Sequence, residues 1–411
     1  MRPHTPLARS LIEARARTDT LFGMVKPDAF YERPIPERHR IIFYLGHLDA
    51  FDWNQIGQGA LGLTPFQNSF DQLFAFGIDP PVGQLPDDKP SDWPTVDEVL
   101  SYNQRVRLNL DEVLDQAPEQ SLHVAVEHRL MHAETFAYIL HQASLDHRLP
   151  PQTRLRLVGP APDLAMIEIP EGPVTLGRPC HDGFGQSPDG SFGWDNEFDA
   201  HACSVASFAI SKYKVTNGEY LEFVRAGAGP PPFWTRRSDQ WFWLAMAGTI
   251  PLPLDWPVYV TYEQALAYAR WAGKTLPTEA QFHRAAYGAP SGEERLYPWG
   301  DEPPDERRGN FDFRHWDPIP VTATPLGDSA FGVSQLVGNG WEWTTTPFQP
   351  FPGFQPFPFY PSYSAPFFDG AHFVLKGASP RTAARLLRRS FRNWFRPNYP
   401  YVYAGFRCVE N

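Results

Sequence analysis

The chain has 411 residues, a length that predicts two domains of ordinary size. Its 36 basic and 47 acidic residues give a formal net charge of −11, which argues against nucleic acid as a partner. Hydrophobic residues make up 42% of the chain, and this excludes wholesale disorder. No apolar stretch approaches the roughly 20 residues that cross a membrane, and the N-terminus carries no apolar leader.

Cysteine usage points to a reducing compartment. The three cysteines, Cys180, Cys203 and Cys408, are odd in number and form no C-x-x-C pair. This pattern supports neither a disulfide framework nor a zinc ribbon. We therefore expect a soluble, cytoplasmic protein that has no membrane partner.

The first part of the chain, residues 1–155, predicts a bundle of four helices. Apolar residues recur at helical spacing in four stretches: residues 5–20, 36–57, a segment that begins at Thr95, and residues 121–142. Thr95 and Glu98 form a T-x-x-E capping box, which marks the start of the third helix. The Pro/Gly-rich segment 58–94 is too long for a simple turn, and we expect it to contribute to a site.

The second part, residues 156–411, predicts an irregular α+β domain, so the fold class of the whole chain is α+β. Short β-like segments separated by Gly, Pro, Asn and Asp are Met166–Ile169, Val174–Leu176, Phe208–Ile210 and Phe373–Lys376. Two short helices are expected, at Asn217–Arg225 and Tyr262–Ala272. The Pro/aromatic-rich segment 347–368 predicts a packed loop, although a polyproline ligand is an alternative interpretation.

The strongest chemical signal is a pair of histidines in the fourth predicted helix. His128 and His132 are four residues apart, so both imidazoles lie on one helix face and can reach one metal ion. The pattern is not H-E-x-x-H, because Arg129 follows His128 where a zinc protease has its glutamate base. Glu134 points away from this face.

A third histidine completes a metal site in this interpretation. His47 lies on the inward face of the second predicted helix, and an imidazole on an apolar face is costly unless its nitrogens find partners. Three imidazoles from two helices form a site that leaves coordination positions open. The alternative is that these are ordinary core or surface histidines. The spacing of His123 places it off the helix face that carries His128 and His132. His141 and His147 fall near the helix end and are expected at the surface.

Several further motifs resemble a known enzyme family. They are Leu45-Gly46-His47, His128-x-x-x-His132-x-Glu134, Val215–Tyr220, Leu276–Ala280, Tyr297–Gly300, Gly338–Trp343 and Gly405–Arg407. The first two resemble the DinB-type bundle of the ergothioneine-type sulfoxide synthases, and the others resemble the formylglycine-generating-enzyme/sulfatase-modifying domain, a relative of C-type lectin folds. The W-E-W and G-F-R motifs can equally be structural positions in a loop-rich core.

The resemblance implies an oxidoreductase with mononuclear non-haem iron(II). Such an enzyme uses O2 to couple a sulfur nucleophile to imidazole C2 of hercynine, with His47, His128 and His132 as the implied metal ligands. The segment Asn393-Trp394-Phe395-Arg396 matches the family's substrate-binding loop. An aromatic wall there suits a quaternary ammonium group through cation–π attraction.

Two departures from the family bear on the co-substrate. Where these synthases often carry Asn-Ser-Tyr-Tyr, this chain reads Asn68-Ser69-Phe70-Asp71, so the phenol that serves in proton transfer is missing. Tyr360, Tyr363 or Tyr399 would substitute. The loss also fits the selenoneine synthase branch, which uses a selenosugar, so cysteine, γ-glutamylcysteine and a selenosugar all stay open. The copper-binding cysteine pair of true formylglycine-generating enzymes is absent from this sequence.

Two other functions compete with this one. A DinB-type thiol transferase would bind zinc or nickel and would need no O2. A lectin-like binding module would bind no metal and would not need the inward histidine face. Metal content together with O2 dependence separates the three hypotheses.

Overall fold

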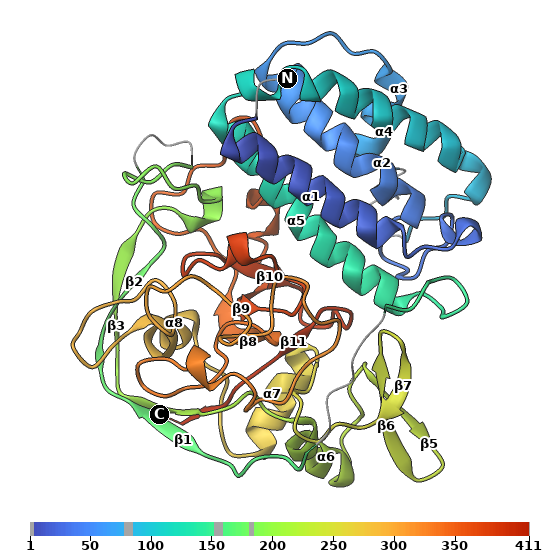
Figure 1. Ribbon diagram of the computed structural model, residues 1–411. Helices are drawn as coiled ribbons and strands as arrows, with labels where there is room; N and C mark the ends of the chain where they lie inside the picture. Colours follow the sequence, from blue (N-terminus) through green and yellow to red (C-terminus); the bar gives the residue numbers. More distant parts are fainter. Residues whose placement is uncertain (1–3, 78–84, 152–158, 181–184, 411) are drawn as a thin grey trace. The chain divides into compact units, whose positions relative to one another are not determined.

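The computed structural model describes residues 4–77, 85–151, 159–180 and 185–410 (Figure 1). The chain forms two compact units, Met1–Pro151 and Gln152–Asn411. The predicted boundary at residue 155 lies outside the described residues. A helical first unit and a second unit that contains sheets confirm the predicted α+β class.

Within its described residues, the first unit has four long helices, as predicted, and one short α-helix. The helices of this unit are α1 (Pro6–Phe22), α2 (Ile41–Asp52), α3 (Asn68–Phe76), α4 (Val96–Asp111) and α5 (Glu119–Gln142). Helices α1 and α5 pack along each other, and α2 contacts α3, α4 and α5 (Figure 1). Every residue of α2 is buried, so α2 is the central helix of this unit.

The start of α4 confirms the predicted capping box. The Thr95 hydroxyl accepts a hydrogen bond from the backbone N–H of Glu98, and the Glu98 carboxylate accepts one from the backbone N–H of Thr95 at 2.8 Å. Both bonds satisfy N–H groups that have no partner inside the helix.

The segment 58–94 contains a helix that the sequence did not predict, α3. The π-helix η2 (Trp53–Ala60) continues α2 and ends in the first residues of this segment. Helix α3 has only nine residues, too few to show a clear 3.6-residue period between Pro/Gly-rich flanks. Residues 78–84 of this segment lie outside the described part.

The described part of the second unit contains four small sheets. Its strands are β1 (Met166–Ile169), β2 (Gly172–Leu176), β3 (His201–Val205), β4 (Phe208–Ser211), β5 (Trp234–Arg237), β6 (Gln240–Ala245), β7 (Gly248–Pro251), β8 (Gly340–Pro347), β9 (Phe373–Ala378), β10 (Asn393–Phe395), β11 (Ala404–Gly405) and β12 (Val409–Glu410). The sheets have the strand orders β1-β4-β12, β10-β9-β8-β11, β2-β3 and β5-β6-β7. The four β-like segments predicted from the sequence all fall in these strands.

Among the residues described in this unit, three short α-helices accompany the sheets: α6 (Asn217–Arg225), α7 (Tyr262–Trp271) and α8 (Glu279–Tyr287). The sequence predicted α6 and α7 but missed α8, which starts inside the motif Leu276–Ala280. Each helix begins with a threonine whose hydroxyl accepts from the third helical residue, and that residue's side chain bonds back to the threonine. Two of the motifs that carried the family resemblance, Val215–Tyr220 and Leu276–Ala280, are thus helix starts.

The W-E-W and G-F-R motifs meet in a buried ion triad. Glu342 of β8 accepts from the Lys214 ammonium at 2.7 Å and from the Arg407 guanidinium at 2.9 Å, and all three side chains are fully buried. Arg407 also donates to the backbone carbonyls of Ser211 and Lys212. The structural interpretation of these motifs is therefore correct, because the triad joins strand β8 to the C-terminal segment.

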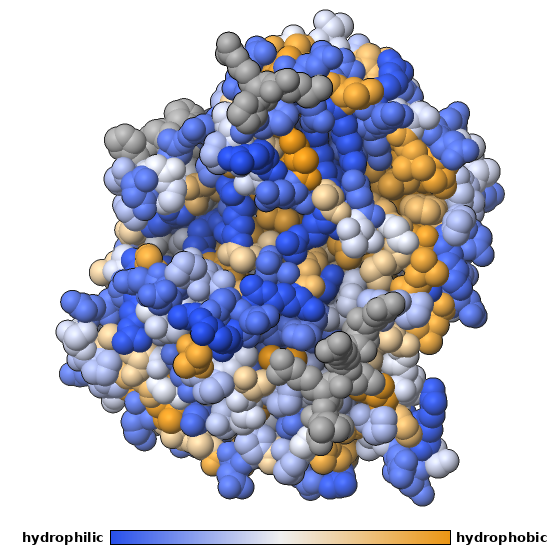
Figure 2. All heavy atoms as spheres, in the orientation of Figure 1, coloured by the Kyte–Doolittle hydropathy of each residue, from blue (hydrophilic) through white to orange (hydrophobic). Residues whose placement is uncertain are grey.

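Four aromatic side chains of the predicted packed loop at 347–368 are buried, as a packed loop requires. Phe348, Phe351, Phe357 and Tyr363 are all at most 8% exposed. A polyproline ligand would have to leave such side chains available to a partner. Hydrophilic residues predominate on the face shown in Figure 2, and none of the described helices is long and apolar enough to cross a membrane.

Replacing Glu342 tests the triad. The variant Glu342→Gln leaves two buried cations without a counter-charge, and we expect it to lower the free energy of unfolding by about 3–5 kcal/mol. Glu410→Gln is the control, because Glu410 is half-exposed where it pairs with Lys274, and its loss should cost at most about 1 kcal/mol. Urea unfolding monitored by tryptophan fluorescence measures both. Equal stability of the two variants would contradict the role of the triad.

Candidate metal centre

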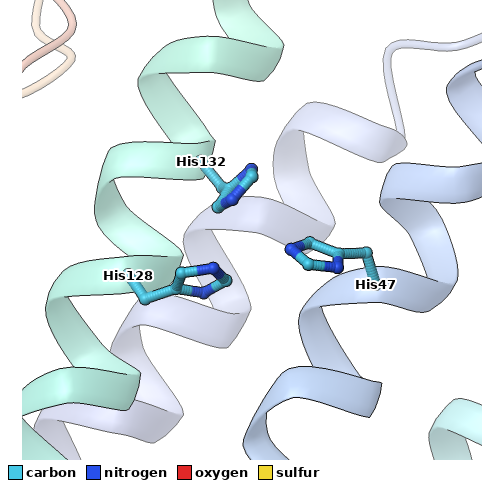
Figure 3. Close-up of side chains that lie close together, drawn as sticks. All are labelled: His47, His128 and His132. Carbon is cyan, nitrogen blue, oxygen red and sulfur yellow. The ribbon is translucent and has the colours of Figure 1, made fainter. Parts of the chain in front are cut away.

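Three imidazoles converge inside the first unit (Figure 3). His47 comes from α2, and His128 and His132 come from successive turns of α5. One nitrogen from each ring lies within 4.8 Å of the others. We call these residues the three-histidine cluster. The structure thus brings together all three predicted metal ligands in one place.

Aromatic side chains surround the three-histidine cluster. Phe51 stacks on His128 with ring centroids 3.4 Å apart, and Phe43 stacks on His47 at 4.8 Å. The ring of Tyr44 lies 6.2 Å from that of His132. These apolar faces cover much of the cluster, because His47 is 8% and His128 is 3% exposed, whereas His132 is partly exposed.

This burial keeps the imidazoles neutral. Burial, opposed in part by a hydrogen bond to a backbone carbonyl, lowers the pKa of His47 to about 4. Burial and the neighbouring imidazoles lower the pKa of His128 and of His132 well below the ordinary value. A neutral imidazole has a free nitrogen lone pair, which is the form that binds a metal.

One hydrogen bond selects which nitrogen of His47 is available. The Nδ1 atom of His47 lies 2.7 Å from the backbone carbonyl oxygen of Phe74 in α3. A carbonyl can only accept, so Nδ1 carries the proton and Nε2 carries the lone pair. This contact was not predicted, because it depends on a helix that the sequence did not reveal.

A buried ion network holds the two ligand-bearing helices together. Arg129 of α5, which directly follows His128, donates to Asp49 at 3.0 Å and to Asp52 at 2.7 Å. Both aspartates belong to α2, and all three side chains are at most 1% exposed. Since the network joins the helix of His128 to the helix of His47, it fixes the spacing of their imidazoles.

Two more arginines extend this network to the outer helices. Arg15 of α1 contacts Asp52 at 3.4 Å, and Arg107 of α4 donates to Asp49 at 2.9 Å. Although burial opposes the effect, Arg129 and Arg107 hold the pKa of Asp49 below its usual value. This network was not predicted from the sequence. The sequence features that could have indicated it are the two aspartates of the largely apolar helix α2 and the arginine next to the predicted ligand His128.

The remaining histidines and Glu134 lie outside the cluster. Glu134 is not a member of the metal-binding group, as expected from its helix position. His123 and His147 are partly exposed. The expectation that His141 lies at the surface is wrong, because it is only 8% exposed. It falls in the last turn of α5, next to the buried residues Ile139 and Leu140.

The second unit gathers several of the predicted substrate and catalytic residues around Trp194. Tyr363 stacks on Trp194 at 3.9 Å, and Tyr360 meets it edge-on at 6.4 Å. Trp394 of β10 lies 5.5 Å from Tyr363 and stacks on Phe348 at 4.2 Å. We call these five residues the aromatic cluster.

The other residues of the predicted substrate loop have different surroundings. The Asn393 side-chain oxygen accepts from the backbone N–H of Trp394, which turns that side chain along the strand. Phe395 stacks on Tyr399 with centroids 5.3 Å apart, and Arg396 is exposed. Phe395 therefore packs on a tyrosine of its own segment.

A buried hydrogen-bond chain supports the aromatic cluster. Ser364 donates to Asp195 and accepts from the Asn196 amide at 2.9 Å. Burial raises the pKa of Asp195 to about 6, and burial together with that carboxylate raises the pKa of Tyr360 to about 12. The Tyr360 phenol therefore keeps its proton at neutral pH.

Most of the arginines near the C-terminus have structural partners. Arg388 pairs with Glu197, and Arg389 pairs with Glu294 at 3.2 Å. The Arg381 guanidinium lies 3.6 Å from the centre of the Trp316 ring. These contacts give Arg381, Arg388 and Arg389 structural partners within the second unit.

Two family models together match nearly the whole chain. One is described as "DinB superfamily" and matches residues 10–148, and the other is described as "Sulfatase-modifying factor enzyme 1-like domain" and matches residues 156–411. The fold and these matches define a two-domain protein, with a DinB-type helical unit followed by a sulfatase-modifying-factor-like unit.

Proteins of similar sequence indicate a more specific family within this class. The hercynine oxygenase of Mycolicibacterium thermoresistibile is 33% identical over 443 residues, which cover 99% of this chain and 95% of the relative. The hercynine oxygenase of Mycolicibacterium smegmatis is 33% identical over 76% of this chain and 77% of the relative. Ergothioneine biosynthesis protein 1 of Schizosaccharomyces pombe is 30% identical, and the match covers 94% of this chain but 54% of that longer protein. The chain belongs to the ergothioneine sulfoxide synthase family.

The chemistry of the three-histidine cluster fits a metal ion. Its donors are three neutral imidazoles, and within the described residues no carboxylate joins them. The Nδ1 atom of His132 is buried and has no hydrogen-bond partner in the described part of the chain. A buried polar atom without a partner costs free energy, and coordination of the ring to a metal offsets that cost.

Metal loading tests the three-histidine cluster. We expect anaerobic Fe(II) or Co(II) to bind at about one ion per chain and to raise Tm, since an ion at 100 times its Kd stabilises the folded state by about 2.7 kcal/mol. His132→Ala should abolish this rise because it removes a ligand. His123→Ala is the matched control on the same helix and should retain it. Elemental analysis and differential scanning calorimetry measure both effects, and an unchanged rise in His132→Ala would exclude this site.

Proposed function

We propose that the protein is a non-haem iron(II), O2-dependent oxidoreductase that forms a C–S or C–Se bond at imidazole C2 of hercynine. The observation that carries the proposal is the convergence of three neutral imidazoles from α2 and α5 within 4.8 Å. Relatives named hercynine oxygenase that align over most of both chains support hercynine as the substrate.

The atoms of the thiol version balance with O2 as the oxidant. The C2–H bond of hercynine and the S–H bond of the donor are lost, and one C–S bond forms. One oxygen atom of O2 becomes the sulfoxide oxygen, and the other leaves as water. Bound ferrous iron supplies the activation of O2 that this chemistry needs.

The chain's own residues have distinct roles in this proposal. The three-histidine cluster holds the metal through nitrogen lone pairs that are free at neutral pH. In the second unit, Trp394 and Phe395 provide aromatic faces for a trimethylammonium group, and Asn393 and Arg396 provide polar contacts. Tyr360 keeps its phenolic proton at neutral pH, so it suits a proton donor, and Tyr363 is the alternative.

The selenium version rests on the segment Asn68-Ser69-Phe70-Asp71. Asp71 is 3% exposed and accepts a hydrogen bond from the Tyr102 phenol at 2.7 Å. The segment contains no tyrosine and so carries no phenol of its own for thiol chemistry, and Asp71 holds α3 in place instead. We therefore include a selenosugar beside cysteine and γ-glutamylcysteine as the donor.

Anaerobic reconstitution tests the function. The protein is loaded with Fe(II) and hercynine, O2 is admitted with each donor in turn, and products are identified by mass spectrometry. We expect one donor to give a coupled product, together with O2 uptake that requires both substrates.

Substitution of one ligand supplies the control for this assay. His128→Ala should reduce coupling by at least about 100-fold because the metal loses a ligand, whereas His123→Ala should stay near the parent activity. Coupling that persists without O2 would favour a metal-dependent thiol transferase. A protein that binds neither metal nor hercynine would be a lectin-like binding module, and either outcome would overturn the proposal.

A further inference from the structure

Helix α3 approaches α2 at a glycine. A Cβ atom added to Gly46 would lie 2.5 Å from the ring of Phe74, which is closer than side chains pack. Phe74 is fully buried, and its ring stacks on Tyr102 with centroids 6.1 Å apart and lies 6.5 Å from Trp93. Because the ring is confined on several sides, the missing side chain at Gly46 is what allows α3 to lie this close.

The close approach places a carbonyl group next to His47. Phe74 lies in the last turn of α3, where backbone carbonyls have no N–H partner within the helix. Its oxygen lies 2.7 Å from Nδ1 of His47, the residue that follows Gly46. The contact satisfies both groups, and it leaves Nε2 of His47 as the atom with the free lone pair.

Helix α3 is itself anchored by Asp71. The Asp71 carboxylate accepts from Tyr102 of α4 at 2.7 Å and from Gln58 of η2 at 3.1 Å. Its backbone carbonyl accepts from the Asn54 amide at 3.1 Å. Three bonds from two neighbouring elements therefore fix α3, and with it the carbonyl that holds His47.

We propose that Gly46 and Phe74 form a positioning pair, which sets the tautomer and ring orientation of His47 and thereby the affinity of the three-histidine cluster for a divalent transition-metal cation. The proposal rests on the proposed function only in requiring that this cluster binds a metal. A metal-bound histidine commonly donates its second N–H to a carbonyl, and loss of such a partner costs about 10–100-fold in metal affinity.

The test compares Gly46→Ala with a variant that weakens the same unit elsewhere. Leu11→Ala removes a fully buried side chain from α1, a helix that carries none of the three histidines. Co(II) affinity of the full-length protein is measured anaerobically by competition with a chromophoric chelator. We expect Gly46→Ala to weaken Co(II) binding by about 10–100-fold and to change the visible Co(II) spectrum, because His47 loses its support. Leu11→Ala should leave both unchanged.

A second measurement reads the tautomer without any metal. In metal-free protein labelled with ¹⁵N-histidine, the His47 signal should show a protonated Nδ1 in the parent and in Leu11→Ala, and a mixture of tautomers in Gly46→Ala. A parent protein that binds no Co(II) would overturn the proposed function. The tautomer data would then still decide whether Gly46 and Phe74 position His47.

A double variant covers the case in which Gly46→Ala does not fold. Replacing Phe74 by leucine keeps the backbone carbonyl and removes ring atoms that the new methyl group would meet. We expect Gly46→Ala/Phe74→Leu to fold and to bind Co(II) as tightly as Phe74→Leu alone. The positioning role would be overturned if Gly46→Ala bound Co(II) like the parent, if Leu11→Ala lost as much affinity, or if the double variant stayed weaker than Phe74→Leu.

Discussion

The ion pairs of Arg129 with Asp49 and Asp52 are the constraint on which the candidate centre depends. They cross from α5 to α2 at 3.0 and 2.7 Å, and all three side chains are at most 1% exposed. Separating these helices would leave buried charges uncompensated, which is among the most costly changes a core can undergo. Because His128 adjoins Arg129 and His47 lies two residues before Asp49, the pairs that hold the helices also hold the imidazoles.

Buried ion pairs also stabilise the second unit. Its short strands and long loops offer little regular backbone pairing, and the buried triad of Lys214, Glu342 and Arg407 ties strand β8 to the C-terminal segment. The same unit contains the aromatic cluster and the hydrogen bonds that support it. In the proposed function the helical unit contributes metal ligands, and the second unit contributes aromatic faces and a phenolic proton.

Local features were predictable from the sequence, and features that depend on tertiary contacts were not. The Thr95 capping box follows from two residue types at a fixed spacing. The shared face of His128 and His132 and the inward placement of His47 follow from helical periodicity. The structure confirms all three predictions. Helix α3 was missed because nine residues between Pro/Gly-rich flanks carry too little periodic signal. The contact of His47 with Phe74 and the partners of Arg129 were missed because they join residues far apart in the chain.

X-ray absorption spectroscopy at the iron edge of the Fe(II)-loaded protein tests the central claim most directly. The account predicts nitrogen and oxygen ligands only, with multiple scattering from three imidazoles per iron in the parent protein and from two in His132→Ala. A sulfur ligand from one of the three cysteines, or an imidazole count that does not change in this variant, would contradict it.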